Sequence, residues 1–102
     1  MKLVEALKAV REENLSKEQL ENYFTSLSGL FSDLQIELAD LEKEEAIFMA
    51  TKDESGNRGT MALKKVLWKA TDLGQRLIML KRYATATSTQ LRSLKTRIFA
   101  LL

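Results

Sequence analysis

The residues best suited to bind a ligand are basic side chains in the second half of the sequence. The seven candidates are Lys64, Lys65, Lys81, Arg82, Arg92, Lys95 and Arg97. Residues 56–102 carry 10 basic residues and 1 acidic residue, a net charge of +9, whereas residues 1–55 carry 6 basic and 13 acidic residues, a net charge of −7. Such a split indicates either a binding surface for a charged partner or two halves that neutralise each other.

Two aromatic residues, Trp68 and Tyr83, are interleaved with these seven cations. A single-stranded nucleic acid needs cations for its backbone and flat rings against which its bases can stack. The combination therefore favours single-stranded nucleic acid as the ligand. The alternatives are a solvated basic surface and a surface that pairs with the acidic helix of a neighbouring subunit.

The sequence offers few residues that could catalyse a reaction, because it contains no Cys and no His. This composition excludes disulfides, thiolate or imidazole metal sites, and Ser-His or Cys-His nucleophile pairs. Four acids at helical spacing, Glu37, Asp40, Glu44 and Glu45, are better interpreted as a salt-bridging surface, since di-iron bundles also need histidine. We expect a protein that is not an enzyme and that binds no cofactor or metal.

The size and hydropathy of the chain are typical of one folded domain, over residues 1–102. Hydrophobic residues make up 45% of the sequence and charged residues 29%, a balance that argues against disorder. No apolar run approaches the ~20 residues that span a bilayer, and charge enters too early, at Lys2 and Glu5, for a signal peptide. We therefore expect a soluble, cytoplasmic protein without a membrane partner.

The spacing of apolar residues predicts an all-α protein with three helices. The first, over residues 3–13, has Leu3, Leu7 and Val10 on one side. The second, over residues 16–52, begins with a capping box formed by Ser16 and Gln19. Its apolar seam, spaced in steps of four and three, is Leu20, Phe24, Leu27, Phe31, Leu34, Leu38, Leu41 and, after one missed position, Phe48.

A glycine-containing turn over residues 53–59 precedes a third helix over residues 60–101, with Thr60 as its cap. The seam of this helix is Leu63, Val66, Ala70, Leu73, Leu77, Leu80, Ala84, Thr87, Leu91, Leu94, Ile98 and Leu101. Thr71 and Gly74 mark a place where the helix could break and be capped again. The free amides at its start, beside Lys64 and Lys65, could hold a phosphate.

The two long helices fit together as an antiparallel coiled-coil hairpin. If the turn is centred between residues 55 and 56, the numbers of paired residues sum to 111. The pairs are Leu41 with Ala70, Leu38 with Leu73, Leu34 with Leu77, Phe31 with Leu80, Leu27 with Ala84, Phe24 with Thr87 and Leu20 with Leu91. The same register predicts two ion pairs, Glu37 with Arg76 and Glu44 with Lys69.

Two long helices and a short one leave apolar side chains uncovered. Those off the seam are Tyr23, Leu30, Ile36, Ile47, Trp68, Ile78, Met79 and Tyr83. A large exposed apolar strip usually marks an interface, so we expect a homo-oligomer. The small residues at 84–89 would let another helix approach closely, either within the hairpin or between subunits.

The order of segments and one local stretch point to a known family. A short N-terminal helix is followed by a long acidic helix ending in Leu41-Glu42-Lys43-Glu44-Glu45-Ala46, a glycine-containing loop and a long basic helix. The last helix ends in Leu94-Lys95-Thr96-Arg97-Ile98-Phe99. Over about residues 15–101 this layout resembles the UvsY-type recombination mediators of tailed phages, whose corresponding stretch reads Ile-Lys-Ser-Arg-x-Phe and which have a lysine-rich segment where residues 64–72 fall.

The resemblance implies a ring-like homo-oligomer that binds single-stranded DNA and helps to load a recombinase onto it. Carried over residue by residue, it supports Lys95 and Arg97 as DNA-binding residues, and Lys64 and Lys65 less directly.

The function predicted from the sequence is that of a non-enzymatic oligomer that binds single-stranded DNA as an accessory factor in phage DNA recombination or replication. Its expected partners are further copies of itself, single-stranded DNA, and a recombinase or single-strand-binding protein. The alternative is a protein-interaction module, such as a phage adaptor, an assembly factor or an inhibitor of a host protein, that does not bind nucleic acid.

Overall fold

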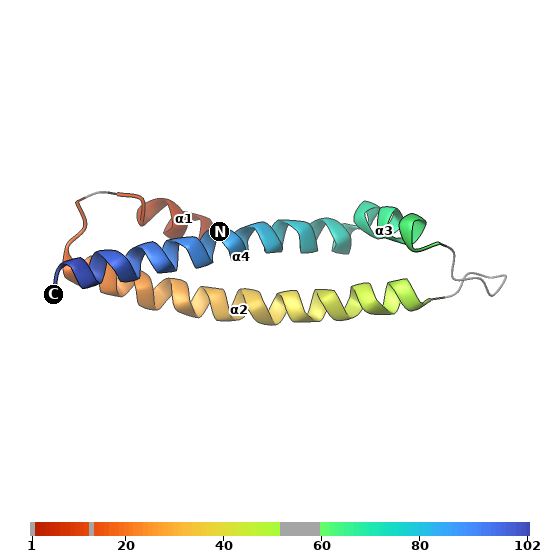
Figure 1. The fold of residues 1–102 in the computed structure, drawn as a ribbon, viewed down its shortest axis with the longest axis horizontal. Helices are drawn as coiled ribbons and strands as arrows, with labels where there is room; N and C mark the ends of the chain where they lie inside the picture. Colours follow the sequence, from red (N-terminus) through yellow and green to blue (C-terminus); the bar gives the residue numbers. More distant parts are fainter. Residues whose placement is uncertain (1, 13, 52–59) are drawn as a thin grey trace. The chain divides into compact units, whose positions relative to one another are not determined.

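All regular secondary structure in the computed structural model is helical over the residues that the structure describes, which are 2–12, 14–51 and 60–102 (Figure 1). The helices are α1 (Lys2–Ala9), α2 (Lys17–Ala50), α3 (Met61–Ala70) and α4 (Asp72–Ala100). The all-α prediction is confirmed. The turn predicted over residues 53–59 lies outside the described residues. Within the described ranges, none of the helices combines the length and apolar character needed to cross a lipid bilayer.

The start of α2 follows the predicted capping box. The Ser16 amide donates to the Gln19 Oε1 atom over 2.9 Å, and the Gln19 amide donates to the Ser16 Oγ atom over 3.2 Å. Two amides that have no partner within the helix are thereby satisfied. This exchange explains why α2 begins directly after Ser16.

The helices form two compact units. The terminal unit comprises the described residues of Met1–Gln35 together with Arg82–Leu102, and the central unit comprises those of Ile36–Lys81. Each unit therefore contains part of α2 and part of α4. In addition, α1 belongs to the terminal unit and α3 to the central unit.

The core of the terminal unit follows the predicted seam except at its last position, because Leu101 is exposed. Its buried apolar side chains are Leu3 and Leu7 from α1, Val10 directly after α1, Leu20, Leu27 and Leu34 from α2, and Leu94 from α4. Leu27 and Thr87 are both 0% exposed, and the Thr87 hydroxyl donates to the Tyr83 carbonyl over 2.7 Å. Because that bond stays within its own helix, a polar side chain can be buried there without an unsatisfied hydrogen-bonding group.

The core of the central unit departs from the predicted seam in α3. Its buried side chains are Leu38 and Leu41 from α2, Lys64 and Trp68 from α3, and Leu77 and Leu80 from α4. The Trp68 ring packs on Phe48 with 5.5 Å between ring centroids and 48° between ring planes. Leu63, Val66, Ala70 and Leu73, all predicted to be buried, are instead exposed.

This correction has a local cause at Thr71, where the helix predicted over residues 60–101 is interrupted. Thr71 is extended, with φ −77° and ψ 157°. Its Oγ1 atom accepts a bond from the Gly74 amide over 3.0 Å and donates one to the Trp68 carbonyl over 2.6 Å. Thr71 thus closes α3 and caps α4 at once, and the break changes which side of α3 faces α2.

Gly74 makes this junction possible. A Cβ atom at position 74 would overlap the Trp68 carbonyl oxygen and lie 2.7 Å from its carbonyl carbon. Only glycine therefore lets the first turn of α4 lie against the last turn of α3.

Candidate nucleic-acid interface

The seven predicted DNA-binding residues are divided between the two units. Lys64, Lys65 and Lys81 belong to the central unit, whereas Arg82, Arg92, Lys95 and Arg97 belong to the terminal unit. The structure thus brings together the four cations nearest to the C-terminus on one stretch of α4. The physical surroundings of each cation decide which of them can meet a ligand.

Lys64 is committed to the fold. Its side chain is only 9% exposed, and its Nζ atom donates to the backbone carbonyls of Met49, over 3.0 Å, and of Thr51. These carbonyls lie at the C-terminal end of α2, where backbone oxygens lack helical partners and a cation is favoured by the helix dipole. Lys64 therefore caps α2 and does not present its ammonium group to a ligand.

Arg97 caps α1 in the same manner. Its Nη1 atom donates to the Val10 carbonyl and its Nη2 atom to the Glu12 carbonyl, each over 2.7 Å. The two bonds hold the segment that follows α1 beside the last turns of α4 (Figure 1). A half-buried guanidinium used in this way has lost two of its donors to the backbone.

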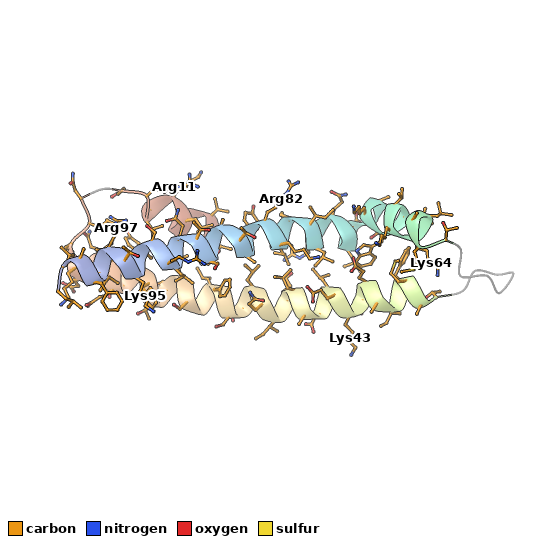
Figure 2. All side chains as sticks on the ribbon, viewed as in Figure 1. Arg11, Lys43, Lys64, Arg82, Lys95 and Arg97 are labelled. Atoms are coloured by element: carbon orange, nitrogen blue, oxygen red, sulfur yellow. The ribbon has the colours of Figure 1, made fainter. Side chains whose placement is uncertain are left out.

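Three of the four predicted DNA-binding cations in the terminal unit remain available. Arg82, Arg92 and Lys95 are all exposed, and among the described residues none of them forms an ion pair. Figure 2 shows Arg82 projecting outward from α4. At 100° per residue, the three side chains fan over about 140° of the helix and about 20 Å of its length. We call these three residues the α4 basic face.

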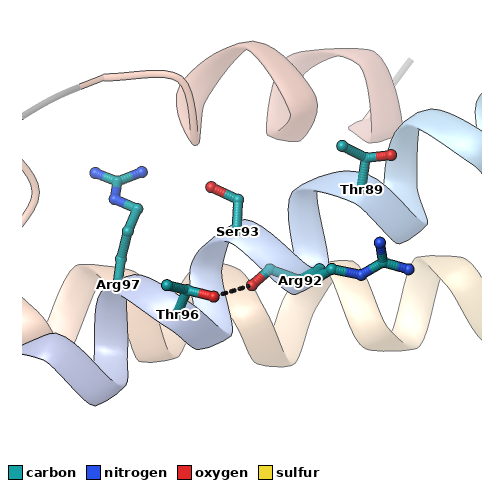
Figure 3. A pocket seen from close by; sticks show the side chains of 5 residues that line it. All are labelled: Thr89, Arg92, Ser93, Thr96 and Arg97. Carbon is teal, nitrogen blue, oxygen red and sulfur yellow. Dashed lines mark hydrogen bonds between the residues drawn. The ribbon is translucent and has the colours of Figure 1, made fainter.

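The amino acids around the α4 basic face suit an anion. The sequence has no acidic residue after Asp72, so α4 supplies no carboxylate along this length. An open hollow of about 330 Å³ beside Arg92 is lined by Thr89, Arg92, Ser93, Thr96 and Arg97 (Figure 3). Thr96 donates its hydroxyl hydrogen to the Arg92 carbonyl, and Thr89 donates to Thr85. The Arg92 guanidinium thus remains the main charged donor at this hollow.

The aromatic platforms differ from those predicted. Trp68 is only 5% exposed because it packs on Phe48, so it cannot stack on a base; that interpretation was wrong. Tyr83 is half-buried. Phe99, which was not predicted to be a stacking ring, is 60% exposed, and the Lys95 Nζ atom lies 6.0 Å from the centre of its ring. Their spacing of four residues, which puts both on one helix face, was the available signal.

The central unit contributes exposed cations of a different kind. Lys65 and Lys69 border a hollow of about 410 Å³ whose lining also includes Glu45, Met49 and Trp68. Arg76 pairs with Glu37, which confirms one predicted ion pair. The other prediction was wrong, because no ion pair joins Glu44 to Lys69 in the described structure. Lys81 is exposed.

Over the described ranges, no cluster of three or more acidic side chains could hold a metal ion. What the arrangement offers is a row of positive charge with one exposed ring, and this can bind an anionic polymer by contacts to its backbone. A search for relatives adds nothing to this reading, since no protein-family model, no curated protein and no solved structure matches the chain.

Proposed function

We propose that this protein is a non-enzymatic, self-associating helical hairpin that binds single-stranded DNA through the α4 basic face. The observation that carries the proposal is the exposure of Arg82, Arg92 and Lys95, free of ion pairs in the described structure, on a helix without an acid after Asp72. Uncompensated cations in a row repel one another. A polyanion that neutralises them gains contacts and releases its own counterions.

The chemistry of the face favours a single strand over a duplex and favours binding without sequence preference. Arg82, Arg92 and Lys95 can contact phosphates, and Phe99 offers a ring on which an unstacked base can lie. No row of amide side chains accompanies them to read base edges, since Gln90 is half-buried. The face is therefore suited to holding a strand regardless of its sequence.

The assignment to phage recombination or replication, in the cytoplasm of a host cell, rests on the resemblance to UvsY-type mediators. Within the stretch that carries the likeness, Lys95 and Phe99 are exposed while Arg97 binds backbone carbonyls. We therefore assign the DNA contact to Lys95 and Phe99 and a positioning role to Arg97. A recombinase or single-strand-binding protein is the partner that such an activity would require.

The test is binding of a fluorescent oligothymidine at several salt concentrations. Replacing Arg82, Arg92 and Lys95 together by Gln should lower the slope of log affinity against log salt by about two, because each lost phosphate contact lowers it by about 0.7–1. The matched control is a triple Gln variant of Lys8, Arg11 and Lys17, which are exposed bases outside α4. It removes the same net charge and should keep most of the slope. Equal loss in both variants, or no binding by the parent at low salt, would refute the proposal.

A second candidate, a protein-interaction module, is favoured by one observation. Several large apolar side chains of α3 are at least half exposed, including Leu63, Val66 and Leu67. If the parent binds no oligonucleotide, this surface becomes the main functional feature of the chain.

A further inference from the structure

The outward side of α3 is more apolar than the side that packs on α2. Its inward residues are Lys64 and Trp68, while Leu63, Val66, Leu67 and Ala70 point away from the core. Val66 is 65% exposed, which is high for a β-branched apolar residue in the middle of a helix. We call Leu63, Val66, Leu67 and Ala70 the α3 outer face. A face of this kind is unfavourable in water and is expected to be covered.

The charges that α3 itself carries are entirely positive. Helix α3 contains three lysines and no acid, and Lys65 and Lys69 are exposed along one flank, four residues apart. A surface that covers this helix should therefore combine apolar side chains with carboxylates.

The chain itself has such a surface on the outward side of α2 in the same unit. Ile36 and Ile47 are exposed there and lie three helical turns apart, with Asp40, Lys43 and Glu44 between them. Residues 36–50 contain five acids and one base. We call Ile36, Asp40, Lys43, Glu44 and Ile47 the α2 outer face.

We propose that the α3 outer face of one copy docks on the α2 outer face of a second copy of this chain. The inference deepens the self-association in the proposed function and rests on it. Asp40 and Glu44 are four residues apart, as are Lys65 and Lys69, so parallel packing of the two helices brings both acids opposite both lysines. The apolar residues of α3 then cover the isoleucines of the partner.

The contact must run head to tail. Within the central unit α3 packs on α2 through Trp68, Phe48 and the Lys64 cap, so the two outer faces point in opposite directions. One copy therefore uses its α3 face on one neighbour and its α2 face on another. Such heterologous contacts produce a closed ring or an open filament.

Two complementary variants test this arrangement by their mass in light scattering. The first, Val66→Glu with Leu67→Glu, disables the α3 outer face; the second, Ile36→Lys with Ile47→Lys, disables the α2 outer face. The parent should have a mass of several copies, and each variant alone should be monomeric. An equal mixture should form a complex of two copies and nothing larger, because it retains one working contact.

The control is Leu101→Glu with Leu102→Glu, which places the same two charges as the first variant on exposed leucines outside both faces and should leave the parent mass unchanged. Three results would show that this contact does not form: a monomeric parent at micromolar concentration, variants that keep the parent mass, or a mixture that stays monomeric. A homodimer of the second variant alone would also overturn the inference, because it would mean that α3 pairs with α3. Oligonucleotide binding is measured on the same samples. The α4 basic face is unchanged in these variants. If the parent binds no oligonucleotide, the DNA proposal is wrong, whereas the contact between the α3 and α2 outer faces is judged by the masses alone.

Discussion

The terminal and central units contain parts of the same two long helices but build their cores differently. In the terminal unit, α4 is continuous from Arg82 onward, and leucines at heptad spacing meet the apolar side of α1. In the central unit, the break at Thr71 directs Lys64 and Trp68 inward and leaves leucines at heptad spacing in solvent. A single helix junction thus decides whether a heptad pattern becomes a core or a surface.

Several small contributions to the free energy of folding favour the break in the central unit. Interrupting the helix changes its backbone bonds at Thr71, but the Thr71 side chain satisfies the Gly74 amide, and such a cap is worth about 1 kcal/mol. Burial of Trp68 against Phe48 replaces burial of Leu63 and Val66, and one large aromatic side chain offsets much of the loss. The Lys64 cap adds hydrogen bonds to carbonyls that the end of α2 would otherwise leave to water.

The largest expected effect tests the orientation of α3 through two adjacent residues. Trp68→Ala should destabilise the protein by about 3–5 kcal/mol, because a buried aromatic side chain is removed. Leu67→Ala should change stability by less than about 1 kcal/mol, since Leu67 is half exposed. Urea denaturation measures both. If Leu67→Ala proved the more costly change, the orientation of α3 with Trp68 inward and Leu67 outward would be wrong.

Two helical glycines, one in each unit, should respond with opposite sign to replacement by alanine. Gly74→Ala should cost about 1–3 kcal/mol, because the added Cβ atom meets the Trp68 carbonyl. Gly29→Ala should instead stabilise α2 by about 0.5–1 kcal/mol, since no atom outside the adjoining turns of its own helix lies within 4 Å of the added group. Thermal melting of the two variants gives the comparison. Stabilisation by Gly74→Ala would indicate a continuous helix through Thr71.

The smallest expected effect compares the two cations that cap other helices. Lys64→Met should cost about 1–2 kcal/mol, because part-buried carbonyls lose their donor while the aliphatic stem is kept. Arg97→Met should cost no more than about 1 kcal/mol, since its carbonyls can find water more easily at a half-buried site. Lys65→Met is the control in the central unit and should be nearly neutral. A cost for Lys65→Met as large as for Lys64→Met would contradict the capping role.

The candidate site could be predicted from the sequence only in part. The lack of acids after Asp72 is visible in the sequence, and it directed attention to α4. Lys64 and Arg97 could not be separated from the other cations, because their carbonyl partners lie 15 and 87 residues away along the chain. Trp68 was misassigned for the same reason, since its packing on Phe48 depends on how α3 faces α2.

The sequence by itself determined the helical class, the capping box at Ser16 and the seam of the terminal unit, because helix periodicity and capping depend on residues within a few positions of one another. It also contained the two residues of the junction, Thr71 and Gly74, but their spacing could not say whether the helix would break there or continue. Only the tertiary structure decided that the helix breaks at Thr71, because the outcome depends both on a local cap and on contacts between residues distant in sequence. That choice places Trp68 inside the central unit and the apolar side of α3 in solvent.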